Sequence, residues 1–251
     1  MSKKYWINQM SWTEFQEAMK QTDLIVIPIG VSEQHGRHNP IGTDTYIAEE
    51  CADRLGKRGG FLIAPTLRYG ASPSFRNYPG TITLNPILLK KIVIGYAESF
   101  IKHGVKRILF LNGHGGNDSV LGAACAHLYE AHGTICSHSE WWNQMPFFPK
   151  KWNCSEHGGV GETSMCMASR PGMVRMEYAT DQGPDPFIPG MEGGRFKEAR
   201  VGLSVDMFKI NKHGNRGNAE KASPELGNEM MDEYVDFVIE FCNELKKVKD
   251  L

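Results

Sequence analysis

Short, continuously apolar runs alternate with amphipathic segments along most of this chain of 251 residues, and this alternation restricts the fold more than any other feature. Runs that are apolar at every position are typical of strands in a parallel sheet that helices cover on both faces. Pro28 must lie near the end of its strand or at a bulge, because proline has no N–H to donate to a sheet. The runs that predict strands are residues 24–29, 61–64, 108–111 and, more weakly, 134–137.

The segments between these runs carry signals for helix starts. Ser11 and Glu14 form a capping-box pattern, and Asn85-Pro86 places a capping residue ahead of a proline at the first helical position. Asn117 is the expected cap of a further helix. The alternation of strands and helices predicts an α/β fold with a mostly parallel sheet and right-handed crossovers. The predicted helices cover residues 11–19, 44–57, 85–103, 117–132 and 223–245.

The stretch from Asp181 to Gly217 breaks this alternation. It is rich in glycine and proline, and it contains Pro184-Asp185-Pro186 and Gly193-Gly194. We expect loops here, with one short strand around Gly202 to Val205, and long loops of this kind often carry function.

Charge and cysteine usage exclude several classes of partner. The formal net charge is −1 and there is no run of lysine or arginine, so nucleic acid and anionic membrane surfaces are not expected partners. No apolar stretch reaches the ~20 residues that cross a bilayer, and the N-terminal residues are too polar for a signal peptide. The six cysteines are scattered, without a Cys-x-x-Cys pair, which favours reduced thiols and a cytoplasmic location.

Three glycine-rich segments place imidazole and carboxylate side chains where they could bind a metal ion. In the first, Glu33 and His35 follow the first predicted strand, and residues two apart in extended backbone project to the same side. Asp44, at the expected start of a helix, is favoured there by the helix dipole and could bridge two cations. Alternatively, Asp44 only caps its helix, and the other two are solvated loop residues.

The second segment, residues 112–117, follows the third predicted strand directly. His114 and His35 then both lie at the carboxyl ends of strands, where open α/β sheets bind ligands. The backbone amides of Gly115 and Gly116 could receive a carbonyl oxygen or an oxyanion. The alternatives are a tight turn or a phosphate-binding loop, although the spacing matches neither common nucleotide-binding pattern.

The third segment carries Glu156, His157 and Glu162. Glu162 falls in the first turn of the next helix, where it could be only a dipole partner, and His157 could be a ligand, a proton carrier or a loop residue. No G-x-S-x-G pattern is present, and Cys154 is the best candidate for a covalent nucleophile. Imidazole and carboxylate ligands without cysteine suit Zn²⁺, Mn²⁺ or Fe²⁺, as one ion or two.

Together these segments resemble the creatininase (creatinine amidohydrolase) family. The matching patterns are Glu33-Gln34-His35-Gly36 with Asp44, Asn112-Gly113-His114-Gly115-Gly116-Asn117, and Glu156-His157-Gly158-Gly159 with Glu162. The resemblance covers nearly the whole chain, and it implies a single domain over residues 1–251. It also implies a three-layer α/β/α fold and a homo-oligomer, which in creatininase itself is a hexamer.

The resemblance also implies roles for individual residues. Asp44 would bridge two divalent ions, and His157 would transfer a proton. Trp141 matches a tryptophan near the active site of the family and is a candidate substrate-binding residue, whereas Trp152 is offset by one residue from a second such tryptophan. The residues that it implies as metal ligands are Glu33, His35, Asp44 and His114.

The chain departs from creatininase at Gly116, where creatininase has a glutamate ligand. Relatives that share the Gly-Gly sequence include formamide-hydrolysing enzymes and a peptidase of mycofactocin maturation. A hydrolase that opens the ring of a keto-inositol has also been placed in the family. Glu162 is the candidate replacement ligand, and it is also a second candidate proton carrier beside His157.

These residues predict metal-dependent hydrolysis of a C–N bond in a cyclic amide, a formamide or a related small substrate, by a water that the metal activates. One alternative is hydrolytic opening of a cyclic ketone or lactone of the keto-inositol type, with the long loop binding hydroxyl groups. Another is a metal-free phosphate-binding module built on residues 113–117. The last is a structural or partner-binding protein without an active site.

Overall fold

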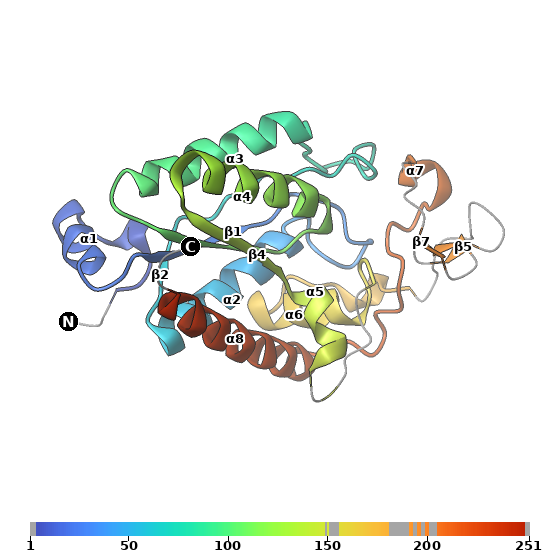
Figure 1. The fold of residues 1–251 in the computed structure, drawn as a ribbon. Helices are drawn as coiled ribbons and strands as arrows, with labels where there is room; N and C mark the ends of the chain where they lie inside the picture. Colours follow the sequence, from blue (N-terminus) through green and yellow to red (C-terminus); the bar gives the residue numbers. More distant parts are fainter. Residues whose placement is uncertain are drawn as a thin grey trace.

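This computed structural model describes residues 4–148, 150, 156–180 and 205–248, together with the backbone of residues 191–192, 195–196 and 199–200. At its centre lies a four-stranded parallel sheet in the order β2-β1-β3-β4 (Figure 1). The predicted strands are confirmed, with Pro28 next to last in β1, although β2 is shorter and β4 longer than predicted. The strands are β1 (Leu24–Ile29), β2 (Leu62–Ile63), β3 (Arg107–Asn112) and β4 (Ile135–Glu140).

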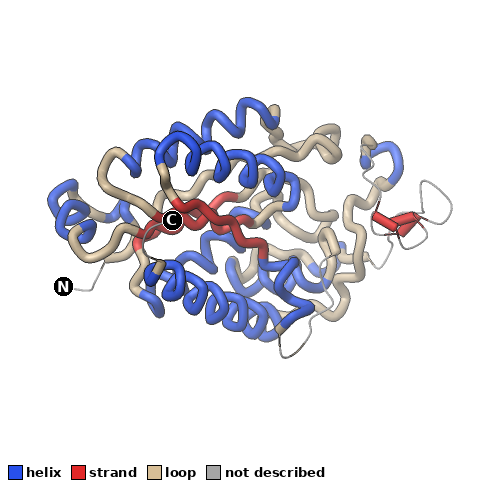
Figure 2. The backbone as a smooth tube through the Cα atoms, viewed as in Figure 1, coloured by secondary structure: helices blue, strands red, loops and turns tan. Residues whose placement is uncertain are grey.

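Helices cover both faces of the sheet, as the doubly apolar strands require (Figure 2). Alternate residues of β1 enter two separate core clusters: Leu24 and Val26 lie in one, and Ile25 and Ile27 lie in the other. Each such fully buried side chain contributes roughly 1.5–3 kcal/mol to folding. The three-layer α/β/α fold is therefore confirmed. The first cluster packs against α2 (Thr43–Gly59), α6 (Val160–Ser169) and α8 (Pro224–Lys247), and the second against α3 (Pro86–Ile101) and α4 (Asp118–His132).

Two of the helix-start signals, at Ser11 and Asn85, work as predicted. Before α1 (Trp12–Met19), the Ser11 side chain accepts a hydrogen bond from the Glu14 amide, and the Glu14 carboxylate accepts one from the Ser11 amide at 2.7 Å. The Asn85 side chain accepts from the amide of Ile87 ahead of α3. A serine at position 223 caps α8 in the same way.

The prediction that Asn117 caps α4 is wrong. Asn117 lies at the helix start, but its side chain makes no capping bond and is fully buried. Its Oδ1 accepts from the amide of Ala71 at 3.0 Å, and its Nδ2 donates to the carbonyl of Gly30 and to Oδ1 of Asn112. The side chain thus ties together the ends of β1 and β3 and the loop at Ala71, which fixes the backbone around His114.

The remaining elements are short. Three two-residue strands, which were not predicted, pair as a small antiparallel sheet within the glycine- and proline-rich stretch. The strand predicted around Gly202 to Val205 lies almost wholly outside the described residues. These elements are η1 (Ile7–Gln9), η2 (Gly115–Asn117), α5 (Trp141–Gln144), η3 (Met145–Phe147), η4 (Met176–Tyr178), β5 (Met191–Glu192), β6 (Arg195–Phe196), β7 (Ala199–Arg200) and α7 (Met207–Ile210).

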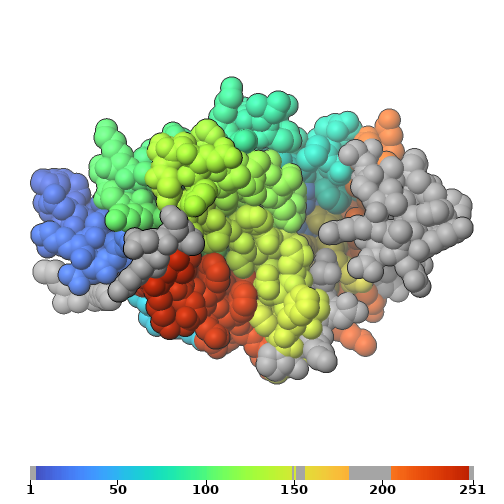
Figure 3. All heavy atoms as spheres, in the orientation of Figure 1, coloured from blue at the N-terminus to red at the C-terminus, as the bar shows by residue number. Residues whose placement is uncertain are grey.

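The C-terminal helix α8 forms part of the molecular surface beside the segment that carries β4 and α5 (Figure 3). Of the described cysteines, Cys51, Cys166 and Cys242 are buried, and all that are described are free thiols. Cys154 and Trp152 lie outside the described residues. Among the helices in the described part of the chain, none combines the length and the apolar character needed to cross a membrane.

Candidate metal centre

The candidate site lies beyond the carboxyl ends of the two central strands. Ile29 of β1 pairs with Asn112 of β3, so the loops that follow these strands begin side by side. Glu33 and His35 come from the loop after β1, and His114 comes from the loop after β3. Three further side chains reach the same place from two helix starts: Asp44 in the first turn of α2, His157 just before α6, and Glu162 in the first turn of α6.

Asp44 lies between the two histidines that the sequence predicted as ligands. Its Oδ1 is 2.8 Å from Nε2 of His35, and its Oδ2 is 2.9 Å from Nδ1 of His114. All three side chains are buried, and Glu33 beside them is only 1 % exposed. The interpretation of Glu33 and His35 as solvated loop residues is therefore wrong. Asp44 thus presents one oxygen to each histidine.

The ligand atoms gather into three overlapping groups, within each of which all atoms lie within 4.8 Å of one another. Glu33, Asp44 and His114 form the first group. His35, Asp44 and Glu162 form the second, so that Asp44 belongs to both. The third group consists of Glu33, His35 and His157.

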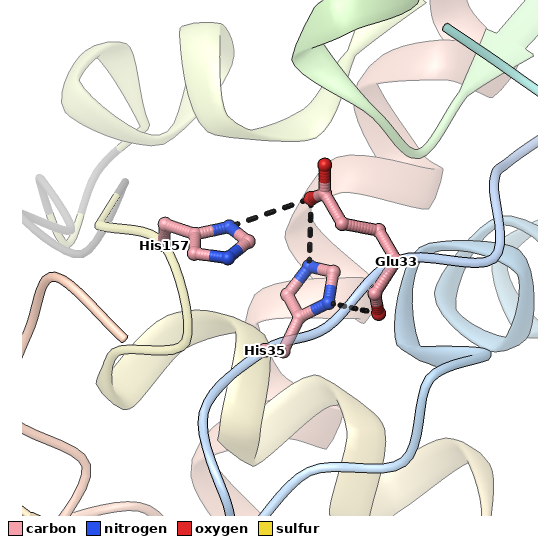
Figure 4. A group of neighbouring side chains, drawn as sticks. All are labelled: Glu33, His35 and His157. Atoms are coloured by element: carbon pink, nitrogen blue, oxygen red, sulfur yellow. Dashed lines mark hydrogen bonds and ion pairs between the residues drawn. The ribbon is translucent and has the colours of Figure 1, made fainter. Parts of the chain in front are cut away.

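Several buried atoms at this centre lack the partner that buried polar atoms almost always have. Oε1 of Glu33 accepts from the Ser72 hydroxyl, but its Oε2 lies 3.8 Å from Nε2 of His35 and 3.6 Å from Nδ1 of His157 (Figure 4). Glu33 Oε2, His35 Nε2 and Asp44 Oδ2 make no hydrogen bond of acceptable geometry among the described residues. Leaving a buried carboxylate oxygen unpaired is costly. Metal ions bound in the groups described above would give each of these atoms a partner, so the residues present fit a metal site.

The outer nitrogens of both histidines are held by backbone carbonyls. His35 Nδ1 lies 3.0 Å from the carbonyl of Glu33, and His114 Nε2 lies 3.0 Å from the carbonyl of Ala71. A carbonyl can only accept, so each outer nitrogen carries a proton and donates it. This fixes the other nitrogen of each ring toward the centre, which is how metal-ligating histidines are usually oriented.

The charges at this centre shift the pKa values of its groups strongly. Although burial opposes it, the carboxylates of Glu33 and Asp44 raise the pKa of His114 to about 9. Burial also lowers the pKa of His35, but the nearby carboxylates of Asp44, Glu162 and Glu33 outweigh this effect and raise it well above its usual value. Burial raises the pKa of Glu162 to about 7, against the pull of His35. The carboxylates thus hold positive charge on the imidazoles at the place where a cation would bind.

Gly116, where creatininase has a glutamate, has no room for a side chain. A Cβ atom at this position would lie 2.0 Å from the carbonyl oxygen of Ala71 and 2.5 Å from Nε2 of His114. Glu162 instead approaches the centre from α6, with its Oε2 3.5 Å from Nε2 of His35. The amide of Gly158, which has a φ of +62° that favours glycine, donates to the same oxygen at 2.6 Å.

His157 faces the centre through one nitrogen only. Its Nε2 lies 2.9 Å from the carbonyl oxygen of Gln34, which favours a proton on this nitrogen, and 3.0 Å from the side-chain amide nitrogen of the same residue. Its Nδ1 points toward the carboxylates, 3.6 Å from Glu33 Oε2 and 3.9 Å from Glu162 Oε2. Burial, together with the positive charge of His35, lowers the pKa of His157 well below its usual value. The lowered pKa keeps the His157 ring neutral, so one of its nitrogens has a lone pair that can accept a proton or bind a cation.

The structure buries Trp141, which was predicted beside the site, and places its neighbour Trp142, which was not predicted, next to Gly115. Trp141 is 2 % exposed and packs in the core cluster below the sheet. Trp142 is partly exposed and packs edge-on against it, with ring centroids 5.6 Å apart. A Cβ atom at Gly115 would lie 3.8 Å from the Trp142 ring, so Trp142 is the tryptophan that borders the loop of Gly115 and Gly116. The family resemblance pointed to Trp141, and nothing in the sequence singled out Trp142.

Sequence reasoning also missed three residues that shape the centre. Ser72 donates to Glu33, Gln34 holds His157 through its carbonyl, and the Phe75 ring stacks on His157 with centroids 4.3 Å apart. Gln34 was part of a recognised motif but had no role. Ser72 and Phe75 lie in a loop without periodicity, and their partners are far away in sequence, so no local pattern could have identified them.

Comparisons with known proteins agree with this geometry. The creatininase family model, described as creatinine amidohydrolase, matches residues 8–242. A creatinine amidohydrolase of Pseudomonas putida is 25% identical over 264 residues, which cover 96% of this chain and 94% of the relative. A mycofactocin precursor peptide peptidase of Mycobacterium tuberculosis is 33% identical over 186 residues, or 68% of this chain and 69% of the relative. A 3-dehydro-scyllo-inosose hydrolase of Thermotoga maritima is 27% identical over 194 residues, or 72% of this chain and 61% of the relative.

Solved structures share the fold over its full extent. The crystal structure of creatinine amidohydrolase superposes with a TM-score of 0.83 at 25% identity, covering 99% of this chain and 100% of the other. Two further creatininase structures, both 24% identical, are described as a manganese form and as a Zn-Zn form of a glutamate-to-glutamine mutant. The fold, the motifs and the family match over most of its length together show that this chain belongs to the creatininase family.

Proposed function

We propose that this chain is a metal-dependent hydrolase that cleaves a C–N bond in a cyclic amide, a formamide or a related small substrate. The observation that carries the proposal is the Asp44 carboxylate, which presents one oxygen to His35 and the other to His114. Glu33 lies beside one of these histidines and Glu162 beside the other. This is the donor set of two adjacent sites that share one bridging carboxylate.

Glu33, Asp44 and His114 would hold one divalent ion, and His35, Asp44 and Glu162 would hold a second. Ligation by oxygen and imidazole nitrogen suits Zn²⁺, Mn²⁺ or Fe²⁺. Ions of this kind, when bound, polarise a carbonyl group and lower the pKa of water. The zinc and manganese forms of creatininase support the first two choices for this chain.

His157 is the proposed proton carrier. We place its proton on Nε2, beside the carbonyl of Gln34, so that the Nδ1 lone pair faces the space between Glu33 and Glu162. Its lowered pKa keeps it neutral, so it can take a proton from the attacking water and pass it to the leaving nitrogen. Glu162 would complete the second ion's ligands with Asp44, whereas the two proposed ions leave His157 free, so we assign the proton transfer to His157 rather than to Glu162.

Gly115 and Gly116 are proposed to bind the carbonyl oxygen of the substrate through their backbone amides. Both glycines are exposed in η2 directly after His114, and among the described residues the Trp142 ring is what lies within 4 Å of a Cβ atom built at Gly115. Amide groups held rigidly in this way stabilise negative charge as it develops on the oxygen. Trp142, rather than Trp141, is then the tryptophan proposed to contact the substrate.

A second candidate function is the hydrolytic opening of a cyclic ketone. The relative from Thermotoga maritima, described as a 3-dehydro-scyllo-inosose hydrolase, aligns with 72% of this chain. The peptide peptidase from Mycobacterium tuberculosis further extends the candidate C–N bonds to those of peptides.

A metal-free phosphate site at residues 113–117 is disfavoured, because the buried carboxylates of Glu33 and Asp44 next to His114 would repel a phosphate.

The test is a substrate panel assayed with protein that has been stripped of metal and reloaded with Zn²⁺ or Mn²⁺. The panel contains small lactams, N-formyl amines, short peptides and a keto-inositol. We expect turnover of a lactam or a formamide that disappears with the metal and returns on reloading. Turnover of the keto-inositol alone would move the assignment to the second candidate. Protein that binds neither ion stoichiometrically and hydrolyses none of the panel would refute the metal-dependent hydrolase.

The role of His157 has its own test. His157→Gln should lower kcat by about 10²- to 10⁴-fold, the usual contribution of a general acid–base group, and should leave the metal content unchanged. His138→Gln is the matched control, because His138 is a partly exposed histidine on the neighbouring strand β4. An unchanged kcat in His157→Gln would remove the residue from the mechanism. The homo-oligomeric state and the cytoplasmic location remain predictions, the first of which light scattering of the purified protein can check.

A further inference from the structure

The imidazole of His157 is enclosed between two other rings. His35 lies on it with centroids 4.3 Å apart at an interplanar angle of 39°, and Phe75 stacks on it at the same distance and an angle of 22°. Two rings this close to one imidazole at small angles would collide if they shared a face. His35 and Phe75 therefore cover opposite faces of the His157 ring.

The two rings that stack on His157 come from different parts of the chain. His35 follows β1, whereas Phe75 lies in the loop between Gly70 and Thr83, which are joined by a parallel β-bridge. The backbone of His157 is fixed separately, since its carbonyl accepts from the amide of Arg216 at 2.6 Å. The side chain still needs a restraint, because the outermost torsion of a histidine has a broad, roughly two-fold preference.

We propose that Phe75 is a positioning residue that holds the His157 imidazole with Nδ1 toward Glu33 and Glu162. The inference rests on the proposed function of His157 as proton carrier. Turning the ring about its outer torsion would place a carbon where Nδ1 now lies and would break the hydrogen bond from Nε2 to the Gln34 carbonyl. Such a turn sweeps the ring edges through the space that Phe75 and His35 fill, so the stacked phenyl ring opposes it.

The same loop supports the centre at a second point. Ser72, three residues before Phe75, donates to Oε1 of Glu33 and so turns the other carboxylate oxygen toward the two histidines. Tyr78 anchors the far side of the loop, where its hydroxyl donates to the carbonyls of Met207 and Asn211. A defect in stacking and a general loosening of the loop can therefore be separated by changing Phe75 and Tyr78 in turn.

The test compares three variants of the zinc-loaded protein. Phe75→Leu removes the flat ring and keeps an apolar side chain, Phe75→Tyr restores the ring, and Tyr78→Phe loosens the loop without touching His157. We expect Phe75→Leu to lower kcat about three- to tenfold with little change in KM, as expected for the loss of one aromatic contact. Phe75→Tyr should recover most of the kcat, and Tyr78→Phe should retain it.

A spectroscopic readout keeps the inference testable whatever the substrate is. In protein labelled with ¹⁵N-histidine, the wild type should show His157 as a single tautomer protonated on Nε2, assigned by the signals that disappear in His157→Gln. Phe75→Leu should give mixed or broadened His157 signals, while Phe75→Tyr and Tyr78→Phe keep the wild-type pattern. Wild-type His157 signals in Phe75→Leu, or equal disturbance in Tyr78→Phe, would overturn the positioning role. An unchanged kcat in His157→Gln would instead count against the proposed function, and the tautomer measurement would still decide the role of Phe75.

Discussion

Two clusters of imidazole and carboxylate groups lie at the carboxyl ends of neighbouring strands, and they have the same kinds of residue but different structures. In the cluster beyond β1 and β3, oxygen and nitrogen atoms of Glu33, Asp44 and His35 converge without hydrogen-bond partners. In the cluster beside β4, His138 pairs with Glu140 through Nδ1. Asp118, at the start of α4, belongs to the second cluster and accepts from the Asn112 side chain at 2.7 Å.

The difference shows what marks a metal site. In the second cluster, His138 is paired with Glu140 and Asp118 with Asn112. Within the described residues, this cluster forms no group of three converging ligand atoms. Asn112 joins the clusters, because its Nδ2 donates to the carbonyl of His114 as well as to Asp118, and its Oδ1 accepts from the His114 amide. Residue type and location at a strand end are therefore not sufficient. The first cluster is distinguished by its burial and by converging oxygen and nitrogen atoms that lack hydrogen-bond partners.

The largest expected effect follows from removing the shared carboxylate. Asp44→Asn takes a negative oxygen from both groups of ligands at once, whereas Asp118→Asn changes only the second cluster. We expect Asp44→Asn to lower zinc affinity by more than about 100-fold, since changes behind the ligands alone already cost 10- to 100-fold. Asp118→Asn should keep wild-type metal content. Elemental analysis of both purified variants decides the comparison, and stoichiometric zinc in Asp44→Asn would contradict the site.

The next effect compares one glycine from each cluster. Gly116→Ala would force a Cβ atom to within 2.0 Å of the Ala71 carbonyl oxygen. A Cβ atom added at Gly122 in α4 would lie at an ordinary 3.6 Å from Nε2 of His138. Overpacking of this kind costs about 1–3 kcal/mol, and each kcal/mol lowers the Tm of a chain this long by roughly 2–4 °C. Gly122→Ala should instead stabilise the helix by about 0.5–1 kcal/mol. Thermal unfolding measures both, and equal shifts would contradict the close approach at Gly116.

Metal binding should also depend on pH in a defined direction. The pKa of His114 is raised to about 9 and that of His35 well above its usual value, so both rings carry an extra proton at pH 7 when no cation is bound. A cation needs the neutral ring, so its binding displaces these protons. The affinity for Zn²⁺ should therefore rise with pH up to about 9, by up to about tenfold per pH unit for each proton released. Calorimetry in buffers of different ionisation enthalpy counts the protons, and zero release at pH 7 would refute the prediction.

Much of the fold and the convergence of the candidate ligands could be predicted because their signals are local. The apolar runs at residues 24–29 and 108–111 are adjacent strands, and a histidine just past each strand end had to lie at the same rim of the sheet. Asp44 followed from its place in the first turn of a helix. These inferences need only the chain direction of parallel strands and the periodicity of secondary structure.

The rest could not be predicted because it depends on contacts between distant loops. Asn117 has the sequence context of a helix cap, yet its side chain bonds to Gly30 and Ala71, which only the packed loops bring near. Whether Trp141 or Trp142 borders the candidate site depends on which of the two adjacent rings is buried in the core, and that ring is Trp141. Phe75 meets His157 across 82 positions of sequence, and no spacing rule spans that distance.

The smallest effect concerns the second cluster alone. Burial and the nearby Glu140 raise the pKa of Asp118 to about 6, from an ordinary value of 3.8. A carboxyl group whose pKa is raised by folding destabilises the folded state wherever it must ionise, so the penalty is absent below pH 3.8, grows between pH 3.8 and about 6, and is complete above that. The difference corresponds to at most ~3 kcal/mol, and solvent screening of this half-buried group reduces it to about 1 kcal/mol.

Asp118→Asn replaces the ionisable group with a neutral one of the same shape. We therefore expect it to raise the free energy of unfolding by about 1 kcal/mol at pH 8 and to leave it nearly unchanged at pH 4. Urea unfolding of the metal-free protein at the two pH values measures the difference directly. A variant that is less stable than the wild type at pH 8 would mean that the ionised Asp118 is needed to hold Asn112, and so that the second cluster supports His114 through its charge rather than through hydrogen bonding alone.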